Sequence, residues 1–238
     1  MPARDRLTGA LVLGGTGAVG RHVVRRLAAA GQPVVFTYHR AADAARALAD
    51  ETGARAVGPL DLSTPGPLRE AFAQLDPAPQ LLVHCAAVAR PAPLPEVTDA
   101  DWSQVLAINA QSALVACQEL ARALEGRPGR VVLLGGLDRA QSLPVPLAYA
   151  ASQGALGALT MALGKELGPR GVLVNMLVTG PLDEGLSRDL DPELLAQYEA
   201  FSAMQRRGTA AEVADAAVWL ATSNGYMNGK VVAVNGGV

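Results

Sequence analysis

The chain has 238 residues, of which 50% are hydrophobic and 18% are charged, and its formal net charge is −2. This length suits one large α/β domain, so we treat residues 1–238 as a single domain. No basic block stands out, which argues against nucleic acid or an anionic membrane as a partner. The polar start, Met1 to Leu7, lacks the pattern of a signal peptide, and no apolar run reaches the roughly 18 residues of a membrane span. We therefore expect a cytoplasmic protein.

Apolar runs and helical patterns alternate along the chain. The expected strands are residues 11–13, 33–38, 54–57, 80–87, 130–134, 172–177 and 230–234. The expected helices are one that follows the first strand and runs to residue 30, then 41–51, 67–75, 101–124, 147–167 and 210–221, with a loop over 179–208 that holds a short helix near 192–203. Continuous apolar strands separated by helices predict a doubly wound, Rossmann-like parallel sheet of about seven strands with helices on both faces.

A glycine-rich turn joins the first strand to the first helix. It reads Gly14-Gly15-Thr16-Gly17-Ala18-Val19-Gly20. Such a turn lets the backbone approach a pyrophosphate, and the helix N-terminus supplies free N–H groups and the positive end of a dipole. The cofactor-binding residues expected here are Gly14, Thr16, Gly17, Val19 and Gly20. The alternative is a tight turn that binds nothing, because the motif alone is weak evidence.

The end of the second strand discriminates between nicotinamide cofactors. An acidic residue there would hydrogen-bond the ribose hydroxyls of NAD. This chain instead has Tyr38-His39-Arg40. Arg40, with His39, suits a 2′-phosphate, so NADP is favoured over NAD. The alternative for Arg40 is a solvated charge at the start of a helix.

With these features in place, the chain resembles the short-chain dehydrogenase/reductase family, in particular its 3-oxoacyl-[acyl-carrier-protein] reductase type. The resemblance covers essentially the whole chain. Its landmarks besides the glycine turn are Asp61-Leu62 after the third strand, Asn109 in the helix 101–124, Tyr149 in Tyr-Ala-Ala-Ser-Gln, and the ending Val-Asn-Gly-Gly. The resemblance implies that Asp61, Leu62 and Ala86 contribute to the cofactor site.

The family's chemistry is a hydride transfer with a proton relay. A tyrosine gives or takes the substrate proton, a lysine one turn later lowers the tyrosine pKa, a serine orients the carbonyl, and an asparagine holds a water. The resemblance therefore implies Tyr149 and Asn109 as catalytic residues. The lysine matters because a tyrosine with a pKa of about 10 is a poor base near neutrality, and a neighbouring cation favours its ionised form.

The sequence departs from this pattern at the residues that carry the chemistry. Gln153 stands at the lysine position, and Gly136, thirteen positions before Tyr149, stands at the serine position. Ser142 is expected to lie too far along the loop to replace that serine. Other departures surround the same cleft: Leu13, Ala18, His84-Cys85-Ala86-Ala87, Thr179-Gly180 and Glu184. We therefore predict that standard hydride transfer is impaired.

Several polar residues have alternative interpretations. Tyr149 is either an acid or hydrogen-bond donor, or a retained structural tyrosine. His84 is either a replacement base or, as we favour, a satisfied core histidine. Glu184 is a base, a helix-start carboxylate or, as we favour from its place in a loop, a solvated charge. Asp138 and Arg139 either rim the substrate cleft or form a surface ion pair. Two cysteines, Cys85 and Cys117, lack metal-ligand spacing and are expected to be buried free thiols.

The resemblance also implies partners. The helices 101–124 and 147–167 match the family's dimer-forming pair, and residues 231–238 match its second interface, so we expect a homodimer or homotetramer, or a hetero-oligomer with an active paralogue. Two functional hypotheses remain. One is a catalytically silent family member that serves as a subunit for an active relative. The other is an active atypical ketoreductase for a small-molecule or acyl-carrier-bound carbonyl, or a non-redox enzyme for elimination, cyclisation or isomerisation, that uses Tyr149.

Overall fold

The structure is a computed structural model that describes residues 7–136 and 144–238. Its seven strands are β1 (Ala10–Leu13), β2 (Val34–Thr37), β3 (Arg55–Val57), β4 (Leu81–His84), β5 (Gly129–Gly135), β6 (Val172–Thr179) and β7 (Val231–Val234). They form one parallel sheet in the order β3-β2-β1-β4-β5-β6-β7. The doubly wound fold predicted from the alternating pattern is confirmed. The expectations for Asp138, Arg139 and Ser142 lie outside the described residues.

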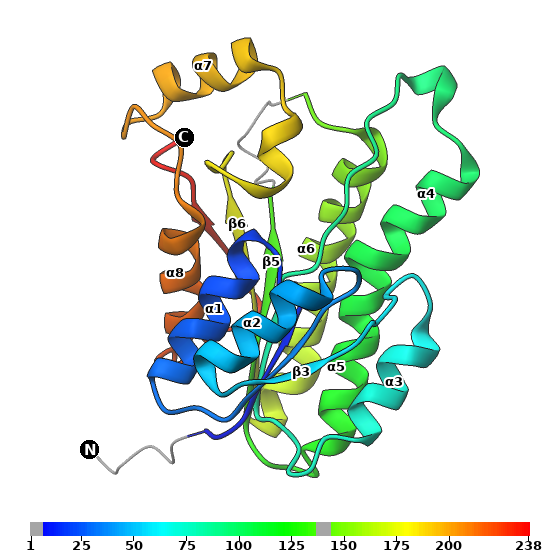
Figure 1. Ribbon diagram of the computed structural model, residues 1–238, viewed down its shortest axis with the longest axis vertical. Helices are drawn as coiled ribbons and strands as arrows, with labels where there is room; N and C mark the ends of the chain where they lie inside the picture. The colour runs from blue at the N-terminus through cyan, green and yellow to red at the C-terminus, as the bar shows by residue number, and fades with distance from the viewer. Residues whose placement is uncertain (1–6, 137–143) are drawn as a thin grey trace.

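Helices cover both faces of the sheet (Figure 1). One face carries α1 (Ala18–Ala29), α2 (Ala42–Thr52) and α8 (Ala210–Thr222), and the other carries α3 (Pro65–Ala73), α4 (Asp99–Leu106), α5 (Ser112–Ala123) and α6 (Leu147–Leu167). Each helix layer encloses its own core of Val, Leu and Ala side chains against the sheet. These two cores fix the strand ends, because the strands are buried between the helix layers.

The strand order reverses between β1 and β4. In doubly wound sheets the crevice at such a switch point, outside the carboxyl ends of the strands, is where ligands bind. Gly14 lies at this point with a φ of +77°, and a Cβ there would stand 2.9 Å from the backbone of Ala86, which follows β4. The glycine is therefore required both by its backbone conformation and by the close approach of the neighbouring segment.

The predicted helix 101–124 is present but differs in two ways. It begins earlier, at Asp99, because the Thr98 side chain caps it by accepting a hydrogen bond from the Asp101 N–H. It is also interrupted by a π-helical segment, Ala107–Gln111 (η2). The Ser112 hydroxyl, just after this segment, donates to the Ile108 carbonyl at 2.6 Å. Such π-segments replace the regular hydrogen-bond pattern locally and are frequent at functional sites.

The expected loop 179–208 is anchored at several points. After β6 it forms a short 3₁₀ segment, η4 (Gly185–Asp189), and then α7 (Pro192–Phe201), which lies beyond the carboxyl ends of the strands (Figure 1). The Tyr198 hydroxyl donates to the Asn235 carbonyl at 2.6 Å, and the Ser202 hydroxyl donates to the Gly236 carbonyl at 3.0 Å. The C-terminal segment thus holds α7 above the sheet.

Candidate functional site

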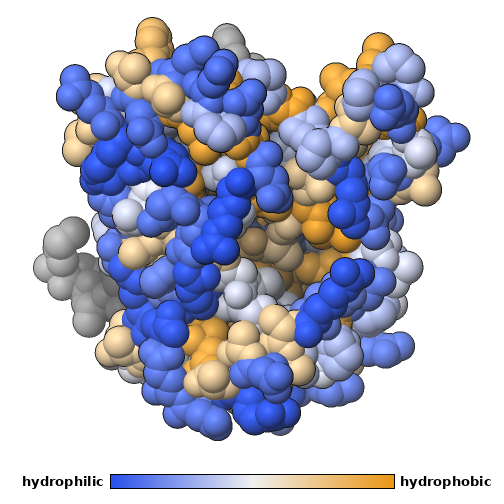
Figure 2. Space-filling view, turned by 45° about the horizontal axis from the view of Figure 1, so that its top comes forward, coloured by the Kyte–Doolittle hydropathy of each residue, from blue (hydrophilic) through white to orange (hydrophobic). Residues whose placement is uncertain are grey.

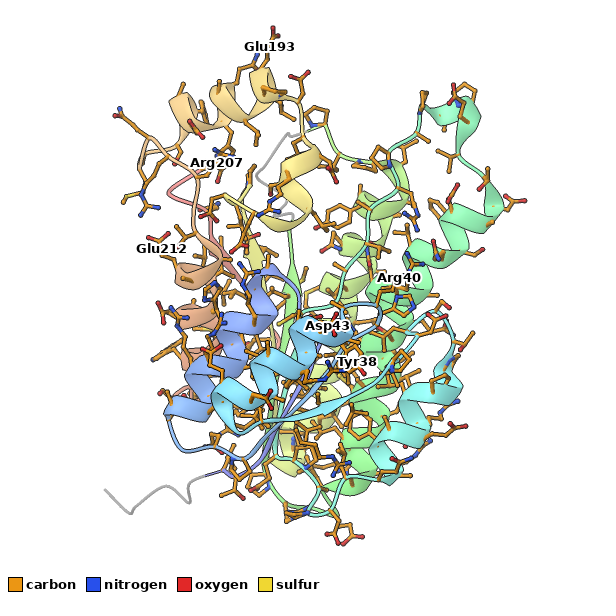
Figure 3. All side chains as sticks on the ribbon, in the orientation of Figure 1. Tyr38, Arg40, Asp43, Glu193, Arg207 and Glu212 are labelled. Carbon is orange, nitrogen blue, oxygen red and sulfur yellow. The ribbon has the colours of Figure 1, made fainter. Side chains whose placement is uncertain are left out.

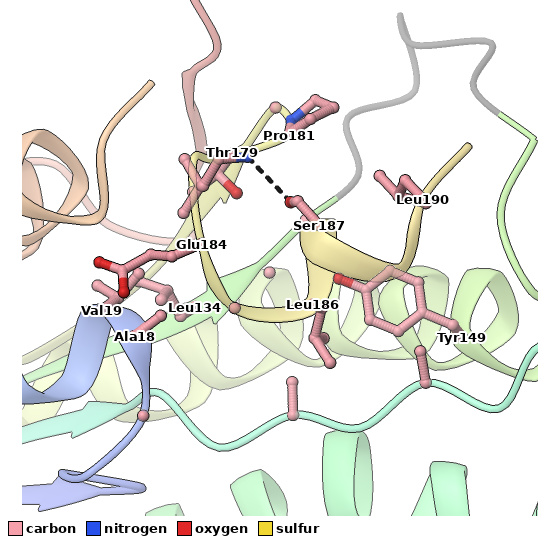
Figure 4. Close-up of a pocket in the computed structure, with 18 of the residues that line it drawn as sticks. Ala18, Val19, Leu134, Tyr149, Thr179, Pro181, Glu184, Leu186, Ser187 and Leu190 are labelled. Carbon is pink, nitrogen blue, oxygen red and sulfur yellow. Dashed lines mark hydrogen bonds between the residues drawn. The ribbon is translucent and has the colours of Figure 1, made fainter. Parts of the chain in front are cut away.

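A pocket of about 320 Å³ opens at the carboxyl ends of β4, β5 and β6. Its walls come from residues 17–19 at the start of α1, residues within 85–89 after β4, residues 134–136 at the end of β5, residues within 145–149 at the start of α6, and residues within 179–190 at and after the end of β6. Most of these residues are apolar, and Figure 2 shows a hollowed face with apolar residues at its floor. Figure 4 shows the pocket in close-up. The site therefore suits a ligand with a large apolar part and few polar contacts.

The glycine turn forms one end of this pocket. The Gly15 N–H donates to the Thr37 carbonyl at 2.8 Å and the Gly14 N–H donates to the Thr37 hydroxyl at 3.1 Å, so the turn is tied to β2. At its N-terminus, α1 has no side-chain cap at Gly17 and no acidic residue in its first turn. Its first N–H groups and the positive end of its dipole are therefore not neutralised by a cap of its own, and they suit an anion, as a pyrophosphate site requires.

Charged residues gather at the carboxyl ends of β2 and β3, on the other side of the glycine turn. His39 and Arg40 are exposed there, with Arg40 close to the start of α2 (Figure 3). The pKa of Asp61 is lowered, first by hydrogen bonds from Ser63 and further by the charges of His39 and Arg40. The structure thus brings Asp61 close to His39 and Arg40, which are neighbours in the sequence but come well before it in the chain. Within residues 7–136 and 144–238, the Arg40 side chain has no hydrogen-bond partner, so its guanidinium is available for a phosphate.

Tyr149 lies in the first turn of α6 and lines the pocket (Figure 4). Its hydroxyl lies so close to the backbone of Gly136 that a Cβ at that position would overlap it. Among the residues that the structure describes, the hydroxyl has no hydrogen-bond partner. Burial raises the pKa of Tyr149 to about 12. The tyrosine is therefore protonated near neutrality and is suited to donate a hydrogen bond, but poorly suited to act as a base.

Gln153 occupies the lysine position and is buried. Its Oε1 accepts a hydrogen bond from the Gly136 N–H at 3.2 Å, and its Nε2 donates to the Ser152 hydroxyl at 3.3 Å. The amide thus turns toward the end of β5 and uses both its donor and its acceptor within the protein. A neutral side chain in this position cannot supply the positive field that lowers a tyrosine pKa.

Asn109 lies behind Tyr149 in the π-segment. Its Oδ1 accepts from the Val88 N–H at 2.9 Å, and its Nδ2 donates to the Val88 carbonyl at 2.9 Å and to the Ser152 hydroxyl at 3.0 Å. The Ser152 hydroxyl in turn donates to the Tyr149 carbonyl at 2.7 Å. Asn109 therefore bridges three segments of the chain, rather than bonding within its own helix. Sequence analysis missed Ser152 as the centre of this network, although its spacing of three from Tyr149 places both on one helical face.

His84 is a core residue, as expected, but it is only partly satisfied. Its Nε2 lies 2.6 Å from the Ser112 hydroxyl, whereas its Nδ1 has no hydrogen-bond partner among the described residues. Burial lowers its pKa to about 4, so the imidazole is uncharged at neutral pH.

Burial also raises the pKa of both free thiols, Cys85 and Cys117, to about 12. Cys117 is buried as predicted, but the prediction was wrong for Cys85, which is partly exposed because it lines the pocket.

The expectation that Glu184 is a solvated charge is wrong. Its side chain is only 14% exposed and forms an ion pair with Arg21 of α1, while His22 Nε2 lies 3.7 Å from its other oxygen. Figure 4 shows Glu184 above Ala18 and Val19, at the first turn of α1. Sequence analysis missed Arg21 because the two partners lie 163 positions apart in the chain.

These features define a class of protein. The N-terminus of α1 is uncapped and lies at the switch point. Two basic residues lie on one side of it, and an apolar pocket with a tyrosine lies on the other. This is the arrangement of a Rossmann-type dinucleotide site. A family model described as "Enoyl-(Acyl carrier protein) reductase" matches residues 15–238. The chain belongs to the short-chain dehydrogenase/reductase family, and it is similar to its 3-oxoacyl-[acyl-carrier-protein] reductases.

Two curated relatives illustrate the range of this family. The "Cyclic-di-GMP-binding biofilm dispersal mediator protein" of Escherichia coli K12 is 33% identical over 217 residues, which are 89% of this chain and 88% of the relative. The "3-oxoacyl-[acyl-carrier-protein] reductase FabG" of Aquifex aeolicus is 29% identical over 237 residues, 96% of each chain. Similar levels of identity thus connect this chain to relatives whose names describe a binding protein and an enzyme.

Solved structures give the same picture. The structure described as "BdcA in complex with NADPH" has a TM-score of 0.87 and 30% identity, and the match covers 96% of this chain and 93% of that one. The short-chain dehydrogenase/reductase from Serratia marcescens has a TM-score of 0.87 and 30% identity, and the match covers 100% of this chain and 99% of that one. A nicotinamide dinucleotide thus occupies a structural neighbour with nearly the same backbone.

Two searches of the described residues gave negative results. Within residues 7–136 and 144–238, His, Cys, Asp and Glu side chains form no group of three or more that could hold a metal ion. In the same part of the chain, every helix is too short or too polar to cross a membrane.

Proposed function

We propose that this chain is an NADP(H)-binding member of the short-chain dehydrogenase/reductase family in which standard hydride transfer is impaired. The observation that carries the proposal is the arrangement around Tyr149. Gly136 supplies no hydroxyl beside it, and Gln153 supplies no charge but bonds to the Gly136 N–H. With its pKa at about 12, Tyr149 has lost the help that the family's lysine gives.

The proposal that NADP is the cofactor rests on the two ends of the site. The uncapped α1 N-terminus suits the pyrophosphate, Arg40 and His39 suit a 2′-phosphate, and Asp61 and Leu62 stand where the family places adenine. The NADPH complex of BdcA supports this cofactor class. When bound, the cofactor would supply a hydride to a carbonyl or remove one from an alcohol.

A second function is favoured by one observation. The Tyr149 hydroxyl faces an apolar pocket as a free donor, which suits the carbonyl oxygen of an acyl substrate. An atypical ketoreductase for a 3-oxoacyl thioester, or a non-redox enzyme for elimination, cyclisation or isomerisation, would use this donor as an acid. FabG relatives support the former by their names.

We further propose that the chain acts as a subunit, either with copies of itself or with an active paralogue. Support comes from α6, whose exposed face carries Leu147, Gly154, Ala158 and Met161 and has no charge before Lys165. Small apolar residues on an exposed helix allow a second helix to approach closely. An Ala158→Glu variant should lower the mass in light scattering, and Ala73→Glu, on exposed α3, should leave it unchanged. Native-source mass spectrometry distinguishes a paralogous partner from a second copy.

The test of the main proposal is a pair of measurements on one preparation. Calorimetry with NADPH and NADP⁺ should give saturable binding, and an assay with acetoacetyl-coenzyme A and NADPH should give turnover far below the usual range of roughly 1–10³ s⁻¹ for enzymes. Absence of binding by both forms would contradict the cofactor assignment. Turnover in the ordinary range would contradict impaired chemistry and support the ketoreductase. The same calorimeter, with cyclic di-GMP as ligand, tests whether the binding role of the Escherichia coli relative extends to this chain.

A further inference from the structure

A partly buried ion pair lies between the glycine turn and the pocket. Glu184, at the start of η4, pairs with Arg21 of α1. Glu184 is among the residues that line the pocket, and Arg21 is not. The pair is therefore a dipole whose negative end lies at the edge of the pocket, over the first turn of α1 (Figure 4). Its side chains are 34% exposed at Arg21 and 14% exposed at Glu184, so water screens the carboxylate less than the guanidinium.

The backbone fixes this carboxylate in place. Gly185, next in the chain, has a φ of +75°, and a Cβ there would lie 3.0 Å from the Ala18 methyl group. The segment thus crosses the first turn of α1 in close contact. On the other side, the Ser187 hydroxyl accepts from the Leu182 N–H at 2.9 Å and closes the loop on itself. Glu184 is held at the boundary between the helix N-terminus and the pocket.

The topology indicates which part of a dinucleotide would meet this carboxylate. If the pyrophosphate lies at the α1 N-terminus and the adenosine half extends toward β2 and β3, where Arg40 and Asp61 lie, the other half must extend over β5 and β6. That half is the nicotinamide riboside, and the space over β5 and β6 is the pocket that contains Tyr149 and Glu184. The ring is cationic when oxidised and neutral when reduced, so a nearby carboxylate distinguishes the two.

We propose that Glu184 is a specificity-determining residue that makes the site prefer the oxidised, cationic nicotinamide over the reduced one. The inference rests on the proposed cofactor function. The two forms carry the same phosphates, so repulsion between Glu184 and the phosphates cancels in the ratio of their dissociation constants. What remains in that ratio is the interaction of the carboxylate with the charge on the ring.

The test is the ratio Kd(NADPH)/Kd(NADP⁺), measured by calorimetry on the parent protein and two variants. Glu184→Gln removes the negative end of the dipole and should lower the ratio by roughly three- to ten-fold, as expected for charges several ångströms apart in a partly screened site. Arg21→Gln leaves the carboxylate without its counter-charge and should raise the ratio. The matched control is Glu51→Gln. It removes a carboxylate of α2 that pairs at 2.8 Å with Arg25 of α1, and neither residue lines the pocket, so the ratio should stay unchanged.

Opposite shifts in the two variants are the signature of a charge effect. If Glu184 only held the loop, breaking the pair from either side would move both affinities in the same way, and the inference would be overturned. An unchanged Kd ratio in Glu184→Gln also overturns the inference about Glu184. In that case the binding of both NADPH and NADP⁺ still supports the cofactor proposal. If neither form binds the parent, the cofactor proposal fails, and this inference fails with it. Thermal unfolding of each variant confirms that the binding measurements concern folded protein.

Discussion

The two ends of the candidate dinucleotide site differ in how closely they keep the pattern of their family. At the end formed by β1, β2 and β3, the glycine turn departs from the family pattern at Leu13 and Ala18, but it keeps Gly14 and Gly20, and the uncapped α1 and the basic residues His39 and Arg40 are in place. At the end formed by β5, β6 and α6, the hydroxyl and the cation expected beside Tyr149 are replaced by Gly136 and Gln153. Binding groups thus persist where reacting groups have changed.

The difference teaches that fold and chemistry depend on separate residues. The Gly136 N–H donates to the Gln153 side chain, so both polar groups are paired. The presence of glycine and glutamine in place of the family's serine and lysine therefore costs the fold little. The same network keeps Asn109 and Ser152 bonded around the Tyr149 backbone. A protein can therefore lose a proton relay and retain the surrounding structure.

The largest effect is expected in the glycine turn. A Cβ at Gly20 would overlap the Gly14 carbonyl, so Gly20→Ala should lower the free energy of unfolding by about 3 kcal/mol and abolish dinucleotide binding. Gly66→Ala is the matched control, because a Cβ there meets no atom within 4 Å. Denaturant titration measures both. Equal stability of the two variants would show that the turn does not require its close packing. It would contradict the claim that the β1–β3 end of the site is preserved.

A smaller effect is expected from His84, beneath the second half of the site. Its folded pKa of about 4 lies below the ordinary 6.5, so the unfolded chain binds the proton more tightly. The contribution of neutral His84 to the free energy of unfolding is therefore fully present above pH 6.5. It is lost as the pH falls from 6.5 toward 4, by about 2 kcal/mol at pH 5. The slope of unfolding free energy between pH 7 and pH 5 should flatten in His84→Asn. An unchanged slope would show that other groups cause the pH dependence.

The smallest effect is expected at the adenosine end. Arg40→Gln removes the exposed guanidinium at the end of β2 and should weaken NADPH binding by about tenfold, while NADH binding changes little, because only NADPH carries the 2′-phosphate. Arg46→Gln, an exposed arginine paired with Asp43 on α2, serves as the control. Equal losses for NADPH and NADH would mean that Arg40 does not read the phosphate.

Most of the fold could be predicted because its signals are local. The helix Leu147–Leu167 was predicted to its end residues from its helical pattern. The π-segment Ala107–Gln111 could not be predicted, because it accompanies the contact of Asn109 with Val88, in a different segment. Short-range patterns do not encode such contacts.

The candidate site was predictable residue by residue but not in its charges. Tyr149, Gly136 and Gln153 follow from their positions in the motif, and the structure brings all three together. The ion pair of Glu184 with Arg21 depends on how the segment after β6 crosses α1, which no spacing in the sequence reveals. The exposure of Cys85 likewise depends on the pocket, so an apolar neighbourhood in sequence was misleading there.

The most direct test of the central claim is the reduction rate of acetoacetyl-coenzyme A by the Gly136→Ser/Gln153→Lys double variant, compared at saturating NADPH with the parent and both single variants. We predict a parent rate near background and at least a roughly 100-fold gain in the double variant, the size of a restored acid–base contribution. Any side chain introduced at Gly136 requires the Tyr149 hydroxyl to move, so Gly136→Ser alone should gain little. A parent that already turns over at an ordinary rate would contradict the account.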